Sequence, residues 1–243
     1  MKTTTTMQPE STKRAAAGRK WQDVGLPQLA KRKHSDHAAE IYDALLWRLH
    51  ANLTTNKTMV VGLIGSQQKS GATTIAAKLA IHAAARQESH VLLIDAHPDS
   101  QKLQKVLRGS SRRGLFDVLS GEISPRECET EQVGAHLELL ACGEKEANYR
   151  IPAQSEMVRE MLDDFRADYN LIIVDLPPVD KLKSSLPLAR ELDGALLVVR
   201  SESARVRETQ RLWQRLHQED VPVLGAILNR HRNYLPQWLS KWF

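Results

Sequence analysis

Short apolar runs alternate with helix-like segments along most of this chain, and the alternation restricts its fold more than any single motif does. The runs are rich in Val, Leu and Ile: Met59–Ile64, His90–Ile94, Leu137–Leu140, Leu171–Val174, Gly194–Val199 and Val223–Leu228. Runs that are apolar nearly throughout are typical of strands covered on both faces. Strands that alternate with helices indicate βαβ units and a mostly parallel sheet.

Segments of helical periodicity lie between most of these strands. We predict helices over Thr73–Arg86, Gln101–Leu107, Ser155–Arg166 and Ala204–His217, and one before the first strand over His37–Leu53. Their apolar residues recur at spacings of three and four, as on one face of a helix. The sequence therefore predicts an α/β fold: a doubly wound, mostly parallel sheet with helices on both faces.

Positive charge is concentrated at the beginning of the chain. Residues 1–35 hold eight basic and two acidic side chains, so their net charge is 8 − 2 = +6. This is more than the net charge of +5 of the whole chain. This leader lacks a repeating apolar face, so we predict that it is disordered. It could touch an anionic membrane surface or nucleic acid, nucleic acid being less favoured, or stay solvated without a partner. We predict a folded domain over residues 36–230.

The composition indicates a cytoplasmic protein. No apolar stretch approaches the roughly 18 residues that span a bilayer, and the leader lacks the apolar centre of a secretory signal. The two cysteines, Cys128 and Cys142, form no C-x-x-C pair and suit a reducing compartment. Residues 231–243 form an aromatic and basic tail, which suits either a membrane interface or a partner groove, or a helix docked on the domain.

The segment GSQQKSGATT follows the first strand and precedes a helix, where nucleotide-binding proteins place the loop G-x-x-x-x-G-K-[ST]. With Gly71 as its second glycine, Ala72 takes the position of the lysine and Thr73 that of the metal-binding hydroxyl. Backbone N–H groups of such a loop surround phosphates. The candidate cofactor-binding residues are Ser66, Gln67, Gln68, Lys69, Ser70, Gly71, Ala72, Thr73 and Thr74. By itself, this segment fits a plain strand-to-helix turn better than it fits a phosphate-binding loop.

Two later strands each end in an aspartate. Asp95 ends the run HVLLID, and Asp175 ends the run YNLIIVD. The carboxyl ends of parallel strands line the ligand crevice of such a sheet. Two carboxylates beside the Thr73 hydroxyl could hold Mg²⁺ directly or through water. A single aspartate there could simply start a turn, but two after nearly identical runs favour a site.

The ordered set of segments resembles a known family. GSQQKSGATTIAAKLA, VLLIDAHPD, RGLFDVLSGE, LELLACGE, YNLIIVDLPPV and VPVLGAILNR follow one another as in the cytoplasmic catalytic domain of CpsD/CapB-type bacterial tyrosine kinases. These kinases act in capsule and exopolysaccharide synthesis and belong with the MinD/ParA group of deviant-Walker P-loop ATPases. The resemblance covers about residues 37–230, and GLFDVLSGE and VDLPPV favour the kinase branch.

The resemblance implies ATP or ADP and Mg²⁺ as cofactors. It implies that Thr73, Asp95 and Asp175 bind the metal and that the two aspartates are catalytic if the protein is active. It also implies tyrosine autophosphorylation and a membrane-embedded polysaccharide co-polymerase as partner. That partner would hold the protein at the inner membrane, where it could form a homo-oligomer.

Several positions depart from the family pattern. Ala72 replaces the phosphate lysine, Gln67 replaces the signature lysine of MinD and ParA, and His97 replaces a second aspartate. Lys69 and Ser70 stand where the family has a glycine and a small or acidic residue. Outside the loop, the family's ring-forming E-x-x-R-x-x-R pattern would begin at Glu40, but Asp43 and Leu46 fill the arginine positions. The family's C-terminal tyrosine cluster has no counterpart here, and only Tyr234 lies in the tail.

Three functions remain open at this point. The departures favour a degenerate nucleotide-binding protein with weak or lost kinase activity and a regulatory or scaffolding role. The second is an active kinase or ATPase in which Lys69 supplies the missing cation. The third, suggested by the basic leader, is a MinD/ParA-like positioning ATPase at a membrane or nucleoid.

Overall fold

The computed structural model describes residues 36–51, 58–86, 89–97, 102–107, 109, 113–125, 127–143, 155–201 and 206–230. The predicted leader and the predicted tail, with Tyr234, lie outside the described residues. None of the helices in the described part of the chain combines the length and apolar character that a bilayer crossing requires.

A seven-stranded sheet lies at the centre of the domain, in the order β3-β4-β2-β5-β1-β6-β7. The strands are β1 (Met59–Gly65), β2 (Val91–Asp95), β3 (Glu131–Gln132), β4 (Leu137–Leu140), β5 (Leu171–Leu176), β6 (Gly194–Arg200) and β7 (Val223–Asn229). Only the β3–β4 pair is antiparallel. The prediction of a mostly parallel sheet is confirmed, whereas the short edge strand β3 was not predicted.

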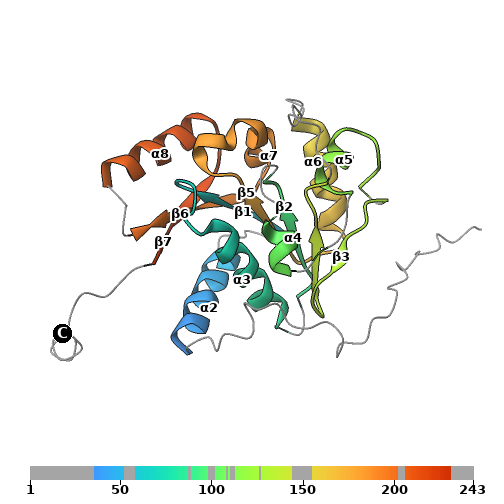
Figure 1. Ribbon diagram of the computed structural model, residues 1–243, viewed down its shortest axis with the longest axis horizontal. Helices are drawn as coiled ribbons and strands as arrows, with labels where there is room; N and C mark the ends of the chain where they lie inside the picture. The colour runs from blue at the N-terminus through green and yellow to red at the C-terminus, as the bar shows by residue number, and fades with distance from the viewer. Residues whose placement is uncertain are drawn as a thin grey trace, which may run out of the picture.

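Helices cover both faces of the sheet, as predicted (Figure 1). One face carries α2 (Asp36–Ala51), α3 (Ala72–Ala84) and α4 (Lys102–Leu107); the other carries α5 (Leu115–Leu119), α6 (Ser155–Arg166), α7 (Leu186–Arg190) and α8 (Val206–Gln218). Helices α5 and α7 and the 3₁₀ helix η1 (Val179–Ser185) were not predicted. These elements have five to seven residues each, which is too short to display a helical period.

The core has two parts, one on each side of the sheet, because successive strand residues point to opposite faces. On β1, Val60 and Ile64 pack under the α5–α8 layer, while Val61 and Leu63 pack under the α2–α4 layer. All of them are fully buried. This double burial is why the strand runs are apolar without alternation.

The positions that depart from the ring-forming pattern help to pack α2 on α3. The carboxylate of Asp43 pairs with His82 on α3, at 2.9 Å, and with Arg86 just after α3. Leu46 is buried in the core beneath the helix. The two positions that hold arginine in the resembled pattern therefore serve contacts within the chain.

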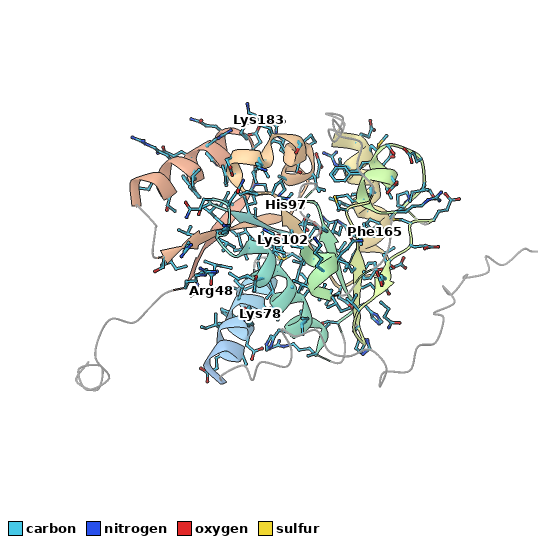
Figure 2. All side chains as sticks on the ribbon, in the orientation of Figure 1. Arg48, Lys78, His97, Lys102, Phe165 and Lys183 are labelled. Atoms are coloured by element: carbon cyan, nitrogen blue, oxygen red, sulfur yellow. The ribbon has the colours of Figure 1, made fainter. Side chains whose placement is uncertain are left out.

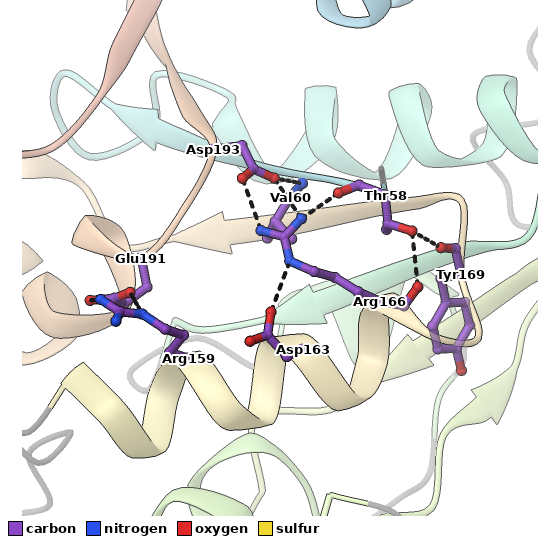
Figure 3. Close-up of polar contacts among 8 residues, drawn as sticks. All are labelled: Thr58, Val60, Arg159, Asp163, Arg166, Tyr169, Glu191 and Asp193. Atoms are coloured by element: carbon purple, nitrogen blue, oxygen red, sulfur yellow. Dashed lines mark hydrogen bonds and ion pairs between the residues drawn. The ribbon is translucent and has the colours of Figure 1, made fainter. Parts of the chain in front are cut away.

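A polar cluster fixes the amino-terminal ends of the strands (Figure 3). The guanidinium of Arg166 pairs with both carboxylate oxygens of Asp193 at 2.9 Å and donates to the backbone carbonyl of Thr58. The backbone N–H of Val60 donates to the same aspartate at 2.7 Å. The cluster joins α6, the start of β1 and the turn before β6, so it stabilises the sheet at the end opposite the strand tips.

Candidate nucleotide site

The loop between β1 and α3 has an unusual backbone. Gly71, the residue before α3, has a φ of 98°, and Lys69 has a φ of 62°. Left-handed backbone suits glycine and strains residues with a Cβ atom. The backbone N–H of Ser70 donates to the carbonyl of Gln67 at 3.2 Å, which closes the loop into a tight turn.

The loop is held from the neighbouring strands β6 and β7. The N–H of Ser66 donates to the carbonyl of Val198 on β6 at 2.9 Å, and the side-chain amide of Asn229, at the end of β7, donates to the carbonyl of Ser70 at 2.8 Å. A Cβ atom on Gly71 would come within 2.1 Å of that amide. The φ of Gly71 therefore favours glycine at this position, and a Cβ atom there would also displace the Asn229 amide.

A pocket of about 380 Å³ opens beside the loop. Eight of the nine predicted cofactor-binding residues line it: Gln67, Gln68, Lys69, Ser70, Gly71, Ala72, Thr73 and Thr74. Ser66 is not among the lining residues. The lining also includes Gly65, His97, Lys102, Leu176, Pro178, Lys181, Arg200 and Arg230. The volume is within the range of about 300–1,000 Å³ that is typical of small-molecule sites.

The two predicted aspartates lie side by side at the tips of neighbouring strands. Asp95 on β2 is the register partner of Asp175 on β5, and each is 1% exposed. Neither is among the residues that line the pocket, but Thr73 and Lys102, which act on the pKa of Asp175, both line it. The N–H of His97 donates to Oδ1 of Asp95 at 3.0 Å. Within the described residues, Oδ2 of Asp95 and both oxygens of Asp175 accept no hydrogen bond of regular geometry.

Burial raises the pKa of both carboxyl groups. It raises the pKa of Asp175 to about 7, although the nearby Thr73 hydroxyl and the charge of Lys102 act in the opposite direction. The pKa of Asp95 is raised well above its usual range, first by burial and then by the charge of Asp175. Two buried carboxylates at adjacent positions repel each other unless a proton or a cation lies between them.

The donors at the site fit a magnesium ion bound together with a phosphate. Mg²⁺ takes oxygen ligands and is usually held by one or two carboxylates, with phosphates and waters completing the set. The unpaired oxygens of Asp95 and Asp175 and the Thr73 hydroxyl supply ligands of this kind. Among the described residues, no group of three His, Cys, Asp or Glu side chains forms a site held by protein alone. The first N–H groups of α3, which have no partner within the helix, suit a phosphate.

The walls of the pocket are strongly basic. Five of the described lining residues are cationic, and none is acidic: Lys69, Lys102, Lys181, Arg200 and Arg230. Lys69 is the only one of them that the sequence indicated for this site. Arg200 is the last residue of β6, as Asp95 is of β2, and Asp175 is the last but one of β5. The rule that identified the aspartates, a charged residue at the carboxyl end of a strand, could therefore also have identified this arginine. The others converge through the tertiary fold alone.

Comparison with known proteins agrees with this geometry. The putative tyrosine-protein kinase EpsB of Ralstonia nicotianae is 27% identical over 201 residues, which is 83% of this chain and 27% of that protein. The kinase domain of Escherichia coli tyrosine kinase ETK is 26% identical and superposes with a TM-score of 0.73, over 87% of this chain and 84% of that domain. The homologues of this chain are bacterial tyrosine kinases. No family model matches it.

The chain spans about a quarter of the length of the curated relatives it matches. MinD from Pyrococcus horikoshii, solved with Mg-ADP, is 21% identical with a TM-score of 0.59 over 76% of each chain, which is a likeness of fold. The predicted P-loop fold and the predicted resemblance to CpsD-type kinase domains are therefore confirmed, and MinD shares the fold.

Proposed function

We propose that this chain binds ATP or ADP with Mg²⁺ in the pocket beside the loop, and that its kinase activity is weak or lost. The observation that supports binding best is one combination: a strained phosphate-type loop, described pocket-lining residues that include five basic and no acidic side chains, and two buried aspartates with unpaired oxygens. The structure of MinD with Mg-ADP shows that this fold can hold such a ligand.

In this proposal, each predicted residue has a role that its position allows. The backbone of residues 66–74 surrounds the phosphates, with the N–H groups at the start of α3 directed at them. Thr73, Asp95 and Asp175 hold the metal. Mg²⁺, when bound, would neutralise phosphate charge. If transfer occurs at all, the same two aspartates are the catalytic carboxylates.

The weak activity follows from Ala72. Its methyl group is 8% exposed and provides neither charge nor a hydrogen-bond donor at the position of the usual lysine. Loss of one preorganised donor to developing negative charge slows chemistry roughly 10²- to 10³-fold. Binding is less affected, because the loop backbone and the helix terminus attract phosphate without that side chain. A protein of this kind fits a regulatory or scaffolding role better than a catalytic one.

The setting of this role is also a proposal. Its homologues are tyrosine kinases, and we infer that the chain acts in exopolysaccharide or capsule synthesis beside a membrane-embedded polysaccharide co-polymerase. It would be cytoplasmic and reach the inner membrane through that partner, with residues 1–35 or 231–243 as further contacts.

Two measurements test the proposed function. Calorimetric titration of the full chain with ATP or ADP in the presence of Mg²⁺ should give saturable binding, and a flat titration at millimolar nucleotide would remove the proposal. Incubation with γ-labelled ATP should leave little label on the protein and release little inorganic phosphate. Label on the protein at the rate of an intact kinase would favour an active kinase, and rapid phosphate release would favour an ATPase.

A further inference from the structure

The pocket around the loop holds cations that the loop itself lacks. The basic lining residues come from different elements: Lys69 from the loop, Lys102 from α4, Lys181 from η1, Arg200 from the end of β6, and Arg230 from just after β7. A pocket with this charge suits a polyanion. The remaining question is which cation takes over from the missing lysine at the metal end of the site.

Lys102 has the position that this role requires. It is the first residue of α4, on the face of the sheet that also carries α3. Its side chain is exposed and lines the same pocket as Thr73 and His97. Figure 2 labels Lys102 and His97 next to each other in its view. The charge of Lys102 also acts on the buried Asp175 carboxyl, which the Thr73 hydroxyl influences as well. Lys102 therefore shares the pocket wall with the Thr73 hydroxyl, and its charge reaches the Asp175 carboxyl.

Lys69 is less suited to the same role. It is exposed within the tight turn that Ser70 and Gln67 close, two residues before Gly71. The charge of Lys102 acts on the pKa of Asp175, and the charge of Asp175 acts on the pKa of Asp95. Lys69 lines the pocket from the exposed turn of the loop, where it can meet a bound polyanion.

We propose that Lys102 supplies the cation for the terminal phosphate of a bound nucleoside triphosphate, in place of the side chain that Ala72 lacks. The inference rests on the proposed function and adds a specificity residue to it. A lysine is a point charge on a flexible four-carbon stem, so it need not start from the usual loop position. Because ADP lacks the terminal phosphate, a cation that pairs with this phosphate should distinguish ATP from ADP.

The test compares two lysines on the same short helix. Lys105 is also exposed on α4, but it does not line the pocket. Titrations with Mg·ATP and Mg·ADP should show that Lys102→Ala weakens ATP binding roughly tenfold or more, as expected for loss of a charged donor, while ADP binding changes little. Lys105→Ala should leave both affinities as in the parent, and Lys102→Arg should keep most of the preference for ATP.

Further arms separate the alternatives. Lys69→Ala should change ATP and ADP affinities by the same factor, and thermal unfolding of Lys102→Ala without nucleotide should match that of the parent, because Lys102 is exposed. If the parent binds nucleotide but Lys102→Ala keeps its ATP preference, this inference fails while the proposed function stands. If the ATP preference is lost in Lys69→Ala instead, the loop lysine has the role. If the parent binds neither nucleotide, both proposals fail.

Discussion

The side-chain amide of Asn229 donates a hydrogen bond to the backbone carbonyl of Ser70 at 2.8 Å, and it thereby ties the last strand to the phosphate-type loop. The two residues are 159 positions apart in the sequence. Ser70 is 2% exposed, so its environment offers little water as a substitute partner. The left-handed turn at Gly71 directly follows this contact, which links the loop conformation to the edge of the sheet.

Asn229→Ala should therefore loosen the loop. Loss of the donor leaves a buried carbonyl unpaired, which costs about 1–3 kcal/mol in free energy of unfolding. We expect Mg·ATP affinity to fall roughly tenfold with it, because part of that energy holds the loop in its binding conformation. Leu228→Ala is the matched control, since that side chain is 61% exposed on the same strand. Equal nucleotide affinities in the two variants would show that the contact does not shape the site.

Much of this fold could be predicted because burial on both faces leaves a direct trace in the sequence. Val60 and Val61 point to opposite sides of β1, and both must be apolar. The aspartates could be predicted for a related reason: a charged residue that ends such a run has to lie at the tip of a strand. Asp95 and Asp175 were placed together on this basis, and they are register partners.

The rest depended on contacts that have no pattern in the sequence. Lys102 and Lys181 belong to separate helical elements, and only the packing of those elements brings both to one pocket. Asn229 ends the edge strand, but its partner is a carbonyl group, and backbone carbonyls are present at every residue. Asp43 and Leu46 could be recognised as departures from a pattern, whereas their use in packing α2 could not.

The stability of the ligand-free protein should fall as pH rises from about 4 to 7. The folded state raises the pKa of Asp175 from 3.8 to about 7, so in that window the folded protein binds more protons than the unfolded chain. The stability that this group contributes is fully present below the pKa of the unfolded chain, and it is lost as pH rises through the pKa of the folded protein. Each unit of pKa difference corresponds to about 1.4 kcal/mol. Urea unfolding at a series of pH values should show this decline.

Asp175→Asn should make that decline shallower, because the amide does not titrate, while Asp95, whose pKa burial also raises, still contributes to it. Mg²⁺ with nucleotide should also raise the stability of the parent most at the alkaline end, where the carboxylates are charged. Asp193→Asn, at the other end of the sheet, should keep the slope of the parent. A parent profile that rises with pH between 5 and 7 would contradict the assignment of a raised pKa to the buried aspartate.

Arg166→Ala should destabilise the domain without affecting the pocket. The variant loses a bidentate ion pair with Asp193 and a hydrogen bond to the Thr58 carbonyl (Figure 3). We therefore expect the free energy of unfolding to fall by about 1–3 kcal/mol. Arg166→Lys should recover only part of this, because an ammonium cannot pair in the same forked geometry. Arg159→Ala is the control. The Arg159 side chain, which pairs with Glu191, is 64% exposed, so this ion pair should contribute only about 0–1 kcal/mol to the free energy of unfolding.

Lys69→Gly should stabilise the folded protein. Lys69 has a φ of 62°, a conformation that costs a residue with a Cβ atom about 1–2 kcal/mol and costs glycine almost nothing. Part of the gain is offset by the greater freedom of glycine in the unfolded chain, so the net effect should be a gain of up to about 1 kcal/mol. Lys69→Ala keeps the Cβ atom and should show no such gain.

Asp220, with a φ of 58° in the turn after α8, offers a matched control, and Asp220→Gly should be stabilised by a similar amount. Urea unfolding of the three variants and the parent tests this prediction: a Lys69→Gly protein no more stable than Lys69→Ala would mean that the loop holds its lysine without strain.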